Sequence, residues 1–101
     1  MIMKGVFIVR AEVPEADREA FEDWYQDEHL SEAKEMFNAI GAWRGWSHVD
    51  PAVHMAFYEF ESVEAAAAIQ DNGTLQILIG KFNEVWEDRV SRTREVIAVA
   101  R

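Results

Sequence analysis

The alternation of apolar and polar residues along the chain predicts the element order β-α-β-β-α-β. Strands are expected where β-branched and aromatic residues gather, and helices where apolar residues recur every three or four positions. The expected strands are 2–10, 42–49, 53–60 and 90–100, with an Asp-Pro turn at 50–51 between the middle two. This order is typical of an α+β domain of ferredoxin-like topology, in which helices cover one face of a four-stranded antiparallel sheet.

The helical segment after the first strand carries two apolar stripes that do not align. One stripe is Ala20, Phe21, Trp24 and Tyr25, and the other is Leu30, Ala33, Phe37 and Ile40. At about 100° per residue the stripes point roughly 160° apart, so one straight α-helix cannot bury both against a sheet. We therefore predict a break between Gln26 and Ser31, with Ser31 capping a second helix that ends at Gly41.

The helical segment before the last strand also divides into two parts. Ser62 is predicted to cap a short helix over 65–69, which Asn72-Gly73 then ends. Thr74 is expected to begin a longer helix, whose apolar positions recur at helical spacing. These positions are Leu75, Leu78, Ile79, Phe82, Val85 and Trp86.

Bulky apolar residues occupy both faces of the expected strands. In the first strand Ile2, Val6 and Ile8 alternate with Met3, Phe7 and Val9, and in the third Val53, Met55 and Phe57 alternate with Ala56, Tyr58 and Phe60. Helices cover only one face, so the other would expose a large apolar patch to water. We expect a homodimer in which a second copy stacks on this face. The alternative is a monomer whose open face is merely less polar than usual.

Composition narrows the class of protein. The 101 residues suit a single domain over 1–101, and 50% hydrophobic with 29% charged residues is a globular balance. The absence of cysteine excludes disulfides and thiolate sites, and it fits a cytoplasmic location. A net charge of −9 argues against nucleic-acid and membrane partners, because the basic cluster of Arg89, Arg92 and Arg94 is small and interrupted.

The stretch Phe21–Leu30 (FEDWYQDEHL), with the Gly-containing turn and the Arg/aromatic strand that follow, resembles the dimeric α+β barrel superfamily. The nearest branch is its EthD-like members, in which an acid–His pair recurs near the end of the first helix, as Glu28-His29 does here. The resemblance implies a pocket between the helices and the sheet of each subunit. The superfamily includes cofactor-free oxygenases, polyketide cyclases, lactone isomerases and haem-degrading enzymes, so no single reaction is implied. The Pro that commonly follows the His is missing from Leu30-Ser31-Glu32.

His29 is the best single candidate for chemistry, because an imidazole titrates near neutrality and can move a proton. Tyr25 lies four residues earlier, where it could share a surface with His29. Trp24 diverges from Tyr25 by about 100°, so we expect one of the two to face the sheet and the other a cavity wall. Glu28 or Asp27 could orient the imidazole. The alternative is that a cationic His29 caps the helix.

The second and third strands carry another candidate group, whose assembly depends on the hairpin register. If Val49 pairs with Val53, His48 faces His54 across the strands, and Arg44, Trp46 and Tyr58 share that face. This constellation could bind a planar anion or an aromatic ligand. The interpretation that we favour is a polar hairpin end in solvent, with Trp46 at the dimer interface.

These residues lead to three functional hypotheses. The first is a cofactor-independent enzyme that acts on an apolar or aromatic compound by proton transfer, oxygenation, isomerisation or cyclisation. The second is a non-catalytic ligand-binding or interaction module, and the third is haem binding through a histidine. No cofactor is predicted, because the chain has no Gly-rich phosphate loop. A metal site of Glu28, His29, His48 and His54 is conceivable, although no ligand spacing supports it.

Overall fold

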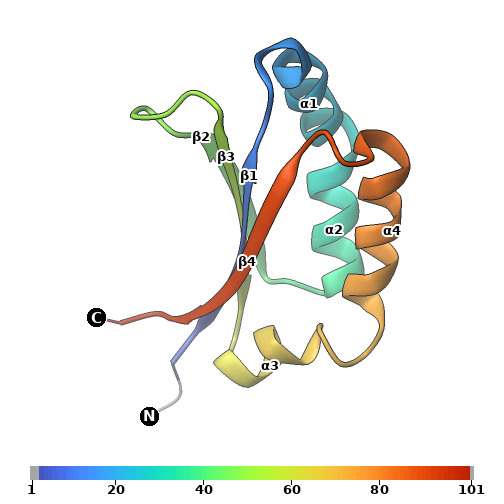
Figure 1. Cartoon of the computed structure of the whole chain (residues 1–101). Helices are drawn as coiled ribbons and strands as arrows, with labels where there is room; N and C mark the ends of the chain where they lie inside the picture. The colour runs from blue at the N-terminus through green and yellow to red at the C-terminus, as the bar shows by residue number, and fades with distance from the viewer. Residues whose placement is uncertain (1–2, 101) are drawn as a thin grey trace.

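The computed structural model describes residues 3–100 and has the predicted order of strands and helices (Figure 1). Its sheet has the strand order β2-β3-β1-β4, and every neighbouring pair is antiparallel. Helices α1, α2 and α4 lie on one side of this sheet (Figure 1), so the expectation of a ferredoxin-like α+β fold is confirmed. The elements are β1 (Gly5–Glu12), η1 (Glu15–Asp17), α1 (Arg18–Trp24), η2 (Tyr25–His29), α2 (Leu30–Phe37), β2 (Gly41–Trp46), β3 (Val53–Phe60), α3 (Val63–Ala68), α4 (Thr74–Trp86) and β4 (Ser91–Ala98).

The ends of several elements differ from the predicted ones. β1 continues through Ala11 and Glu12, where a break was expected, and Ile2 lies outside the described residues. Asn38, not Gly41, ends α2, because Asn38 takes the left-handed conformation with φ 57° that an asparagine tolerates. Gly41 instead begins β2, where it pairs with Glu59 of β3.

The predicted break in the first helical segment is wrong in form. The chain stays helical from Arg18 to Phe37, and Ser31 lies inside α2 and caps nothing. The phase change is absorbed by a π-helical turn, η2, whose extra residue rotates the second stripe by about 100°. Both stripes thereby reach the sheet side, as the burial of Phe21 and Phe37 shows.

In the segment before β4 the predicted cap and the start of the second helix are confirmed, and the short helix α3 runs over Val63–Ala68 where 65–69 was predicted. The Ser62 hydroxyl oxygen accepts a hydrogen bond from the Ala65 amide at 3.1 Å and caps α3. Asn72 accepts one from the Thr74 amide at 3.0 Å, and Gly73 turns the chain with φ 84° into α4. Across residues 3–100, none of these helices combines the length and apolar character needed to cross a bilayer.

The two faces of the sheet are unequal. The helix-covered face holds an aromatic core, whose fully or nearly buried rings are Phe7, Phe21, Tyr25, Phe37, Tyr58, Phe82 and Trp86. The open face carries Ile8, Trp43, Met55, Phe57 and Ile97, and no helix covers it (Figure 1). Trp43 is 46% exposed on this face, and the centre of its ring lies 5.5 Å from that of Phe57, on which it stacks. This face keeps the apolar character that the sequence predicted.

Candidate functional site

A small cavity lies between the helical layer and the sheet, on the side of β1 and β4. Its free volume is about 20 Å³, which is room for one water molecule, within a wider hollow of about 320 Å³ that includes space open to solvent. The wall is mostly apolar, and five polar side chains reach it. The residues that line this His29 cavity are Phe7, Val9, Tyr25, His29, Ala33, Phe37, Tyr58, Leu75, Leu78, Ile79, Phe82, Arg92 and Arg94.

His29 enters the cavity from the last position of the π turn. Residues five apart in an α-helix diverge by about 140°, whereas the i→i+5 bonding of a π turn brings them onto adjacent turns. The Trp24 and His29 rings accordingly stack at 4.1 Å with an interplanar angle of 15°. His29 is only 6% exposed, and its Nδ1 has no hydrogen-bond partner among the described residues. Burial lowers the pKa of His29 to about 4, so the imidazole is neutral at pH 7.

Two tyrosines lie beside His29 in the cavity wall. The Tyr25 ring is 4.9 Å from the His29 ring, and both Tyr25 and Tyr58 are buried. Burial raises the pKa of Tyr25 to about 12 and that of Tyr58 well above its usual value. Both phenols are therefore protonated at neutral pH, and because their hydroxyls hydrogen-bond to each other, one O–H of the pair is left to donate into the cavity.

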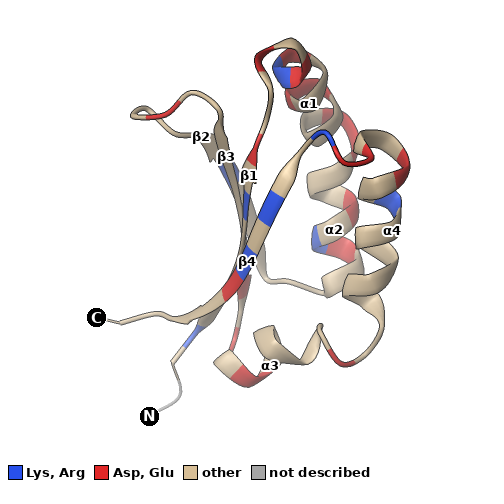
Figure 2. Cartoon of the chain, viewed as in Figure 1, with Lys and Arg blue, Asp and Glu red and all other residues tan. Residues whose placement is uncertain are grey.

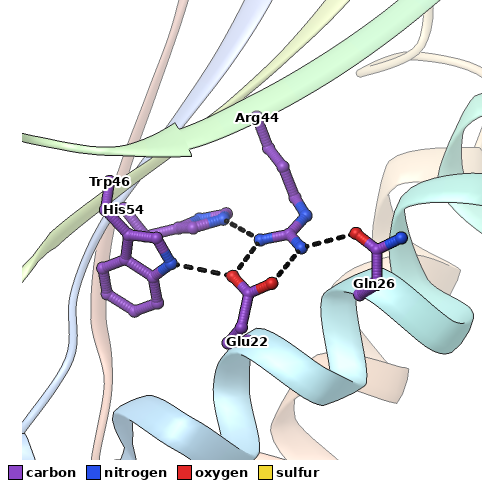
Figure 3. Close-up of polar contacts among 5 residues, drawn as sticks. All are labelled: Glu22, Gln26, Arg44, Trp46 and His54. Carbon is purple, nitrogen blue, oxygen red and sulfur yellow. Dashed lines mark hydrogen bonds and ion pairs between the residues drawn. The ribbon is translucent and has the colours of Figure 1, made fainter.

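A second polar group, the Glu22 network, joins α1 and η2 to the hairpin of β2 and β3 (Figure 3), and the ring of its His54 lies 4.5 Å from that of Tyr25. The Arg44 guanidinium holds both carboxylate oxygens of Glu22, at 2.6 and 2.7 Å, and also donates to Gln26 at 2.9 Å. The Trp46 indole donates to the same carboxylate at 2.9 Å. Hydrogen bonds from Arg44 and then Trp46 lower the pKa of Glu22 to about 2. Arg44 is thus occupied by a carboxylate of the chain and does not line the cavity.

His54 completes the Glu22 network, since its Nε2 lies 3.4 Å from an Arg44 nitrogen (Figure 3). A guanidinium only donates, so Nε2 is the acceptor and the proton is assigned to Nδ1, which has no partner in the described structure. Burial, and then the Arg44 charge, lower the pKa of His54 to about 4. His54 is fully buried, so the favoured interpretation of a solvated hairpin end is wrong for it. Trp46 likewise faces Phe21 and His54 on the helix side and not the open face.

The hairpin register differs from the one considered by two residues. Trp46 pairs with His54, and Arg44 pairs with Ala56, so the predicted common face survives because a shift of two preserves parity. His48 does not share this face, because β2 ends at Trp46 and His48 is exposed in the turn. The considered metal set is therefore not assembled, and no trio of His, Asp or Glu across residues 3–100 is placed to hold a metal.

Two interpretations of the residues around His29 also fail. Asp27 and Glu28 are exposed, and neither hydrogen bonds to the imidazole, because the π turn directs them away from the core. A cationic helix cap is excluded by burial, which keeps the ring neutral. Both Trp24 and Tyr25 adjoin the His29 ring, and Tyr25 also lies 4.5 Å from the His54 ring of β3 and lines the cavity.

Sequence reasoning missed four residues of these two groups: Glu22, Gln26, Arg92 and Arg94. A signal for the arginines was present, since Arg92 and Arg94 alternate with Thr93 in a strand and must share a face. No comparable signal marked Glu22, because its partner comes from a strand 22 residues away.

Comparison with known proteins adds evidence on the fold. No protein-family model matches the sequence, and no curated protein is detectably similar to it. Among solved structures, an ethyl tert-butyl ether D (EthD) family protein from Bacillus halodurans C-125 superposes with a TM-score of 0.73 and 16% identity, over 97% of this chain and 100% of that one.

Two further structures are similar over nearly the whole chain. A candidate antibiotic biosynthesis monooxygenase from Nitrosomonas europaea gives a TM-score of 0.63 at 17% identity, covering 98% of this chain and 92% of that one. A NIPSNAP family protein of unknown function from Agrobacterium tumefaciens gives a TM-score of 0.65 at 15% identity, covering 96% of this chain and 89% of that one. Identities this low establish the fold and not the activity. The chain therefore has the ferredoxin-like α+β fold of the dimeric α+β barrel proteins, and the resemblance to them, EthD-like members included, is confirmed at that level.

Proposed function

We propose that the chain is a cytoplasmic, cofactor-independent enzyme that moves a proton on a small apolar or aromatic organic compound in the His29 cavity. The observation that carries the proposal is a neutral, nearly buried imidazole that lines a mostly apolar cavity and whose Nδ1 has no partner among the described residues. A structural neighbour described as a candidate antibiotic biosynthesis monooxygenase supports small-molecule chemistry on this fold. The absence of cysteine supports the reducing location.

The proposed step is removal of a proton from an acidic C–H or O–H of the bound compound. That bond breaks, the proton moves to His29, and the electron pair stays on the substrate as an enolate or phenolate. One O–H of the hydrogen-bonded pair Tyr25 and Tyr58 can donate to the negative oxygen, and the other supports it through the bond between the two hydroxyls. Return of the proton to another carbon completes an isomerisation or cyclisation, and dioxygen is the co-reactant where the carbanion is oxygenated.

Solvent exchange tests the proposed step without knowledge of the natural substrate. In deuterium oxide, NMR would follow exchange of the acidic C–H of a panel of aromatic ketones and unsaturated lactones. We expect His29→Gln, which keeps most of the side-chain volume, to slow catalysed exchange by about 10²–10⁴-fold. The matched control, His48→Gln, alters an exposed imidazole and should exchange at the wild-type rate. Equal exchange by His29→Gln and wild type would overturn the proposal.

A second candidate function is ligand binding without catalysis, and the small free volume favours it. A cavity of about 20 Å³ holds a water molecule but not an organic compound, so a ligand must displace side chains at the cavity mouth. The same panel separates the two functions: saturable binding without any exchange supports a binding module.

Haem binding, the third hypothesis, fits the geometry poorly. A porphyrin needs an open slot beside its histidine, and the space beside His29 is about 20 Å³ and closed on one side by the stacked Trp24 ring. A Soret band that appears on addition of haemin and disappears in His29→Gln would restore this hypothesis.

For the assembly we propose a homodimer in which two copies stack their open sheet faces. Trp43 and Ile97 are 46% and 39% exposed on that face, and they adjoin Ile8, Met55 and Phe57. Covering such a patch removes apolar surface from water, at roughly 25 cal/mol per Å². A second copy of the chain is present in every solution of the protein. Because its open face is identical, two copies can form a symmetric contact.

Sedimentation tests this assembly. Wild type should sediment as a dimer at micromolar concentration, and Phe57→Glu should sediment as a monomer with an unchanged far-ultraviolet spectrum. Val49→Glu, at a residue that is 93% exposed in the hairpin turn, is the control and should remain dimeric. A monomeric wild type would overturn the proposal.

A further inference from the structure

Two arginines reach the His29 cavity from β4. Arg92 and Arg94 pair with Ala11 and Val9 of β1, so strand alternation places both side chains on the helix-covered face. Both are half-buried and line the same cavity as His29. Figure 2 shows the basic segments of β4 as blue bands along the strand.

Neither guanidinium is neutralised by a carboxylate of the described residues. In residues 3–100 the ion pairs of the structure use Lys4, Arg10, Arg44, Lys81 and Arg89, while Arg92 and Arg94 pair with no carboxylate. Arg92 donates to the Asn83 amide oxygen at 3.0 Å and lies 3.7 Å above the centre of the Phe82 ring. Acidic residues outnumber basic ones by 19 to 10, and none of those that the structure describes forms an ion pair with Arg92 or Arg94.

The two guanidinium groups repel each other, and no carboxylate of the described residues offsets this repulsion. Burial, and then the Arg94 charge, lower the pKa of Arg92 to about 10, and burial lowers that of Arg94. Both remain cationic at pH 7. An anion between them would remove the repulsion and supply the missing acceptors.

We propose that Arg92 and Arg94 form an anion subsite of the His29 cavity, so that its ligand is a planar organic acid whose carboxylate or enolate oxygens lie between the two guanidinium groups. The carbon skeleton would then contact Ile79, Leu78 and Phe82, and its acidic position would face His29. Entry requires the arginine side chains to move apart, because the free volume is about 20 Å³. The location of this subsite rests on the proposed function, but its charge preference can be tested by binding alone.

The probes are benzoate and its neutral isostere benzamide, titrated by calorimetry at low salt. We expect benzoate to bind at least about tenfold more tightly than benzamide, and we expect added sodium chloride to weaken benzoate alone. Arg92→Gln and Arg94→Gln should each weaken benzoate by about tenfold and leave benzamide unchanged.

Arg10→Gln is the matched control, because it removes the same charge from the neighbouring strand on the opposite face of the sheet. It should bind benzoate as wild type does, with sedimentation used to verify an unchanged assembly. Equal affinity for the two probes, or equal loss in Arg10→Gln and Arg94→Gln, would overturn the anion subsite.

His29→Gln separates this inference from the proposed function. If the anion subsite is correct, His29→Gln binds benzoate within about twofold of wild type, since the arginines are intact. Selective benzoate binding without any proton exchange leaves the subsite standing and removes the catalytic proposal. Proton exchange that depends on His29, without tighter binding of benzoate than of benzamide, leaves the catalytic proposal standing and removes the anion subsite.

Discussion

Two groups of polar side chains lie between the helices and the sheet, and they differ in how completely they are paired. In the Glu22 network, the Glu22 carboxylate receives hydrogen bonds from Arg44 and Trp46, and Arg44 also reaches Gln26. In the His29 cavity, the imidazole Nδ1 has no partner in the described chain, and the cavity arginines pair with no carboxylate.

The difference indicates separate roles for two sites that share Tyr25 as their boundary. Its ring is 4.5 Å from His54 on one side and 4.9 Å from His29 on the other. The charged groups of the Glu22 network are paired with each other, and only the His54 Nδ1 in it has no partner among the described residues. A network whose charges are paired within the protein stabilises the fold and has little capacity left for a charged ligand. Groups that are buried without partners are costly to keep, and such groups cluster where a ligand supplies the missing contacts.

Acid should act most strongly on the unpaired imidazoles. The folded-state pKa values of His29 and His54 are about 4, below the ordinary 6.5, so the unfolded chain binds these protons first as the pH falls. Their contribution to stability is complete above pH 6.5 and is lost as the pH falls towards 4. We expect each to cost about 2 kcal/mol of unfolding free energy between pH 7 and 5, measured by urea denaturation.

The three histidines provide the control for that measurement. His29→Gln and His54→Gln should each reduce the loss of unfolding free energy between pH 7 and 5 by about 2 kcal/mol. His48→Gln should leave that loss unchanged, because His48 is exposed. A slope that persists in the double variant of His29 and His54 would contradict the assigned neutrality.

Removal of Arg44 should have the next largest effect. Arg44→Ala leaves the Glu22 carboxylate without its fork, while the Arg44 side chain itself is only 9% exposed. We expect a loss of about 2 kcal/mol, less than for a fully buried pair because Glu22 is 43% exposed and can rehydrate. Arg44→Lys keeps the charge without the bidentate geometry and should recover only part of this loss, as denaturation would show.

Loss of the indole hydrogen bond should be smaller. Trp46→Phe removes the donor 2.9 Å from Glu22, and we expect a cost of about 1 kcal/mol together with a rise in the pKa of Glu22. Carbon-detected NMR titration of the carboxylate measures the second effect. Trp24→Phe is the control, since the same substitution beside His29 should not move the Glu22 titration.

The smallest effect is expected for the cavity arginines. Arg94→Gln removes one of two like charges and breaks no ion pair, so unfolding free energy should change by less than about 0.5 kcal/mol. Arg44→Ala replaces an arginine on the same face that does have an ion pair, so the difference between the two variants tests the distinction between the Glu22 network and the His29 cavity. A loss as large as that of Arg44→Ala would identify Arg94 as structural.

Much of the fold could be predicted from local pattern. The third strand was predicted with its observed bounds, Val53–Phe60. The Asp-Pro turn precedes it, the helix cap Ser62 follows it, and apolar residues fill the positions between. The cap at Ser62 and the start of α4 at Thr74 were also predictable, since they depend on residues within three positions. The candidate site was predicted in part: His29, Tyr25 and Tyr58 line one cavity, whereas His48 and Glu28 lie in solvent.

The sequence by itself determined the periodicities, and with them the element order, the face that each strand residue takes and the conflict between the two stripes around His29. Tertiary structure decided how that conflict is resolved, since a π turn and a kink satisfy the same pattern and only packing against the sheet distinguishes them. It also decided which arginine meets a carboxylate. Arg44 and Glu22 are 22 residues apart, and Arg92 and His29 line one cavity from a strand and a helical turn that are distant in the chain. These groups therefore come together only after strands and helices have been brought together. Periodicity acts over a few residues of chain, whereas charge pairing acts over a few ångströms of space.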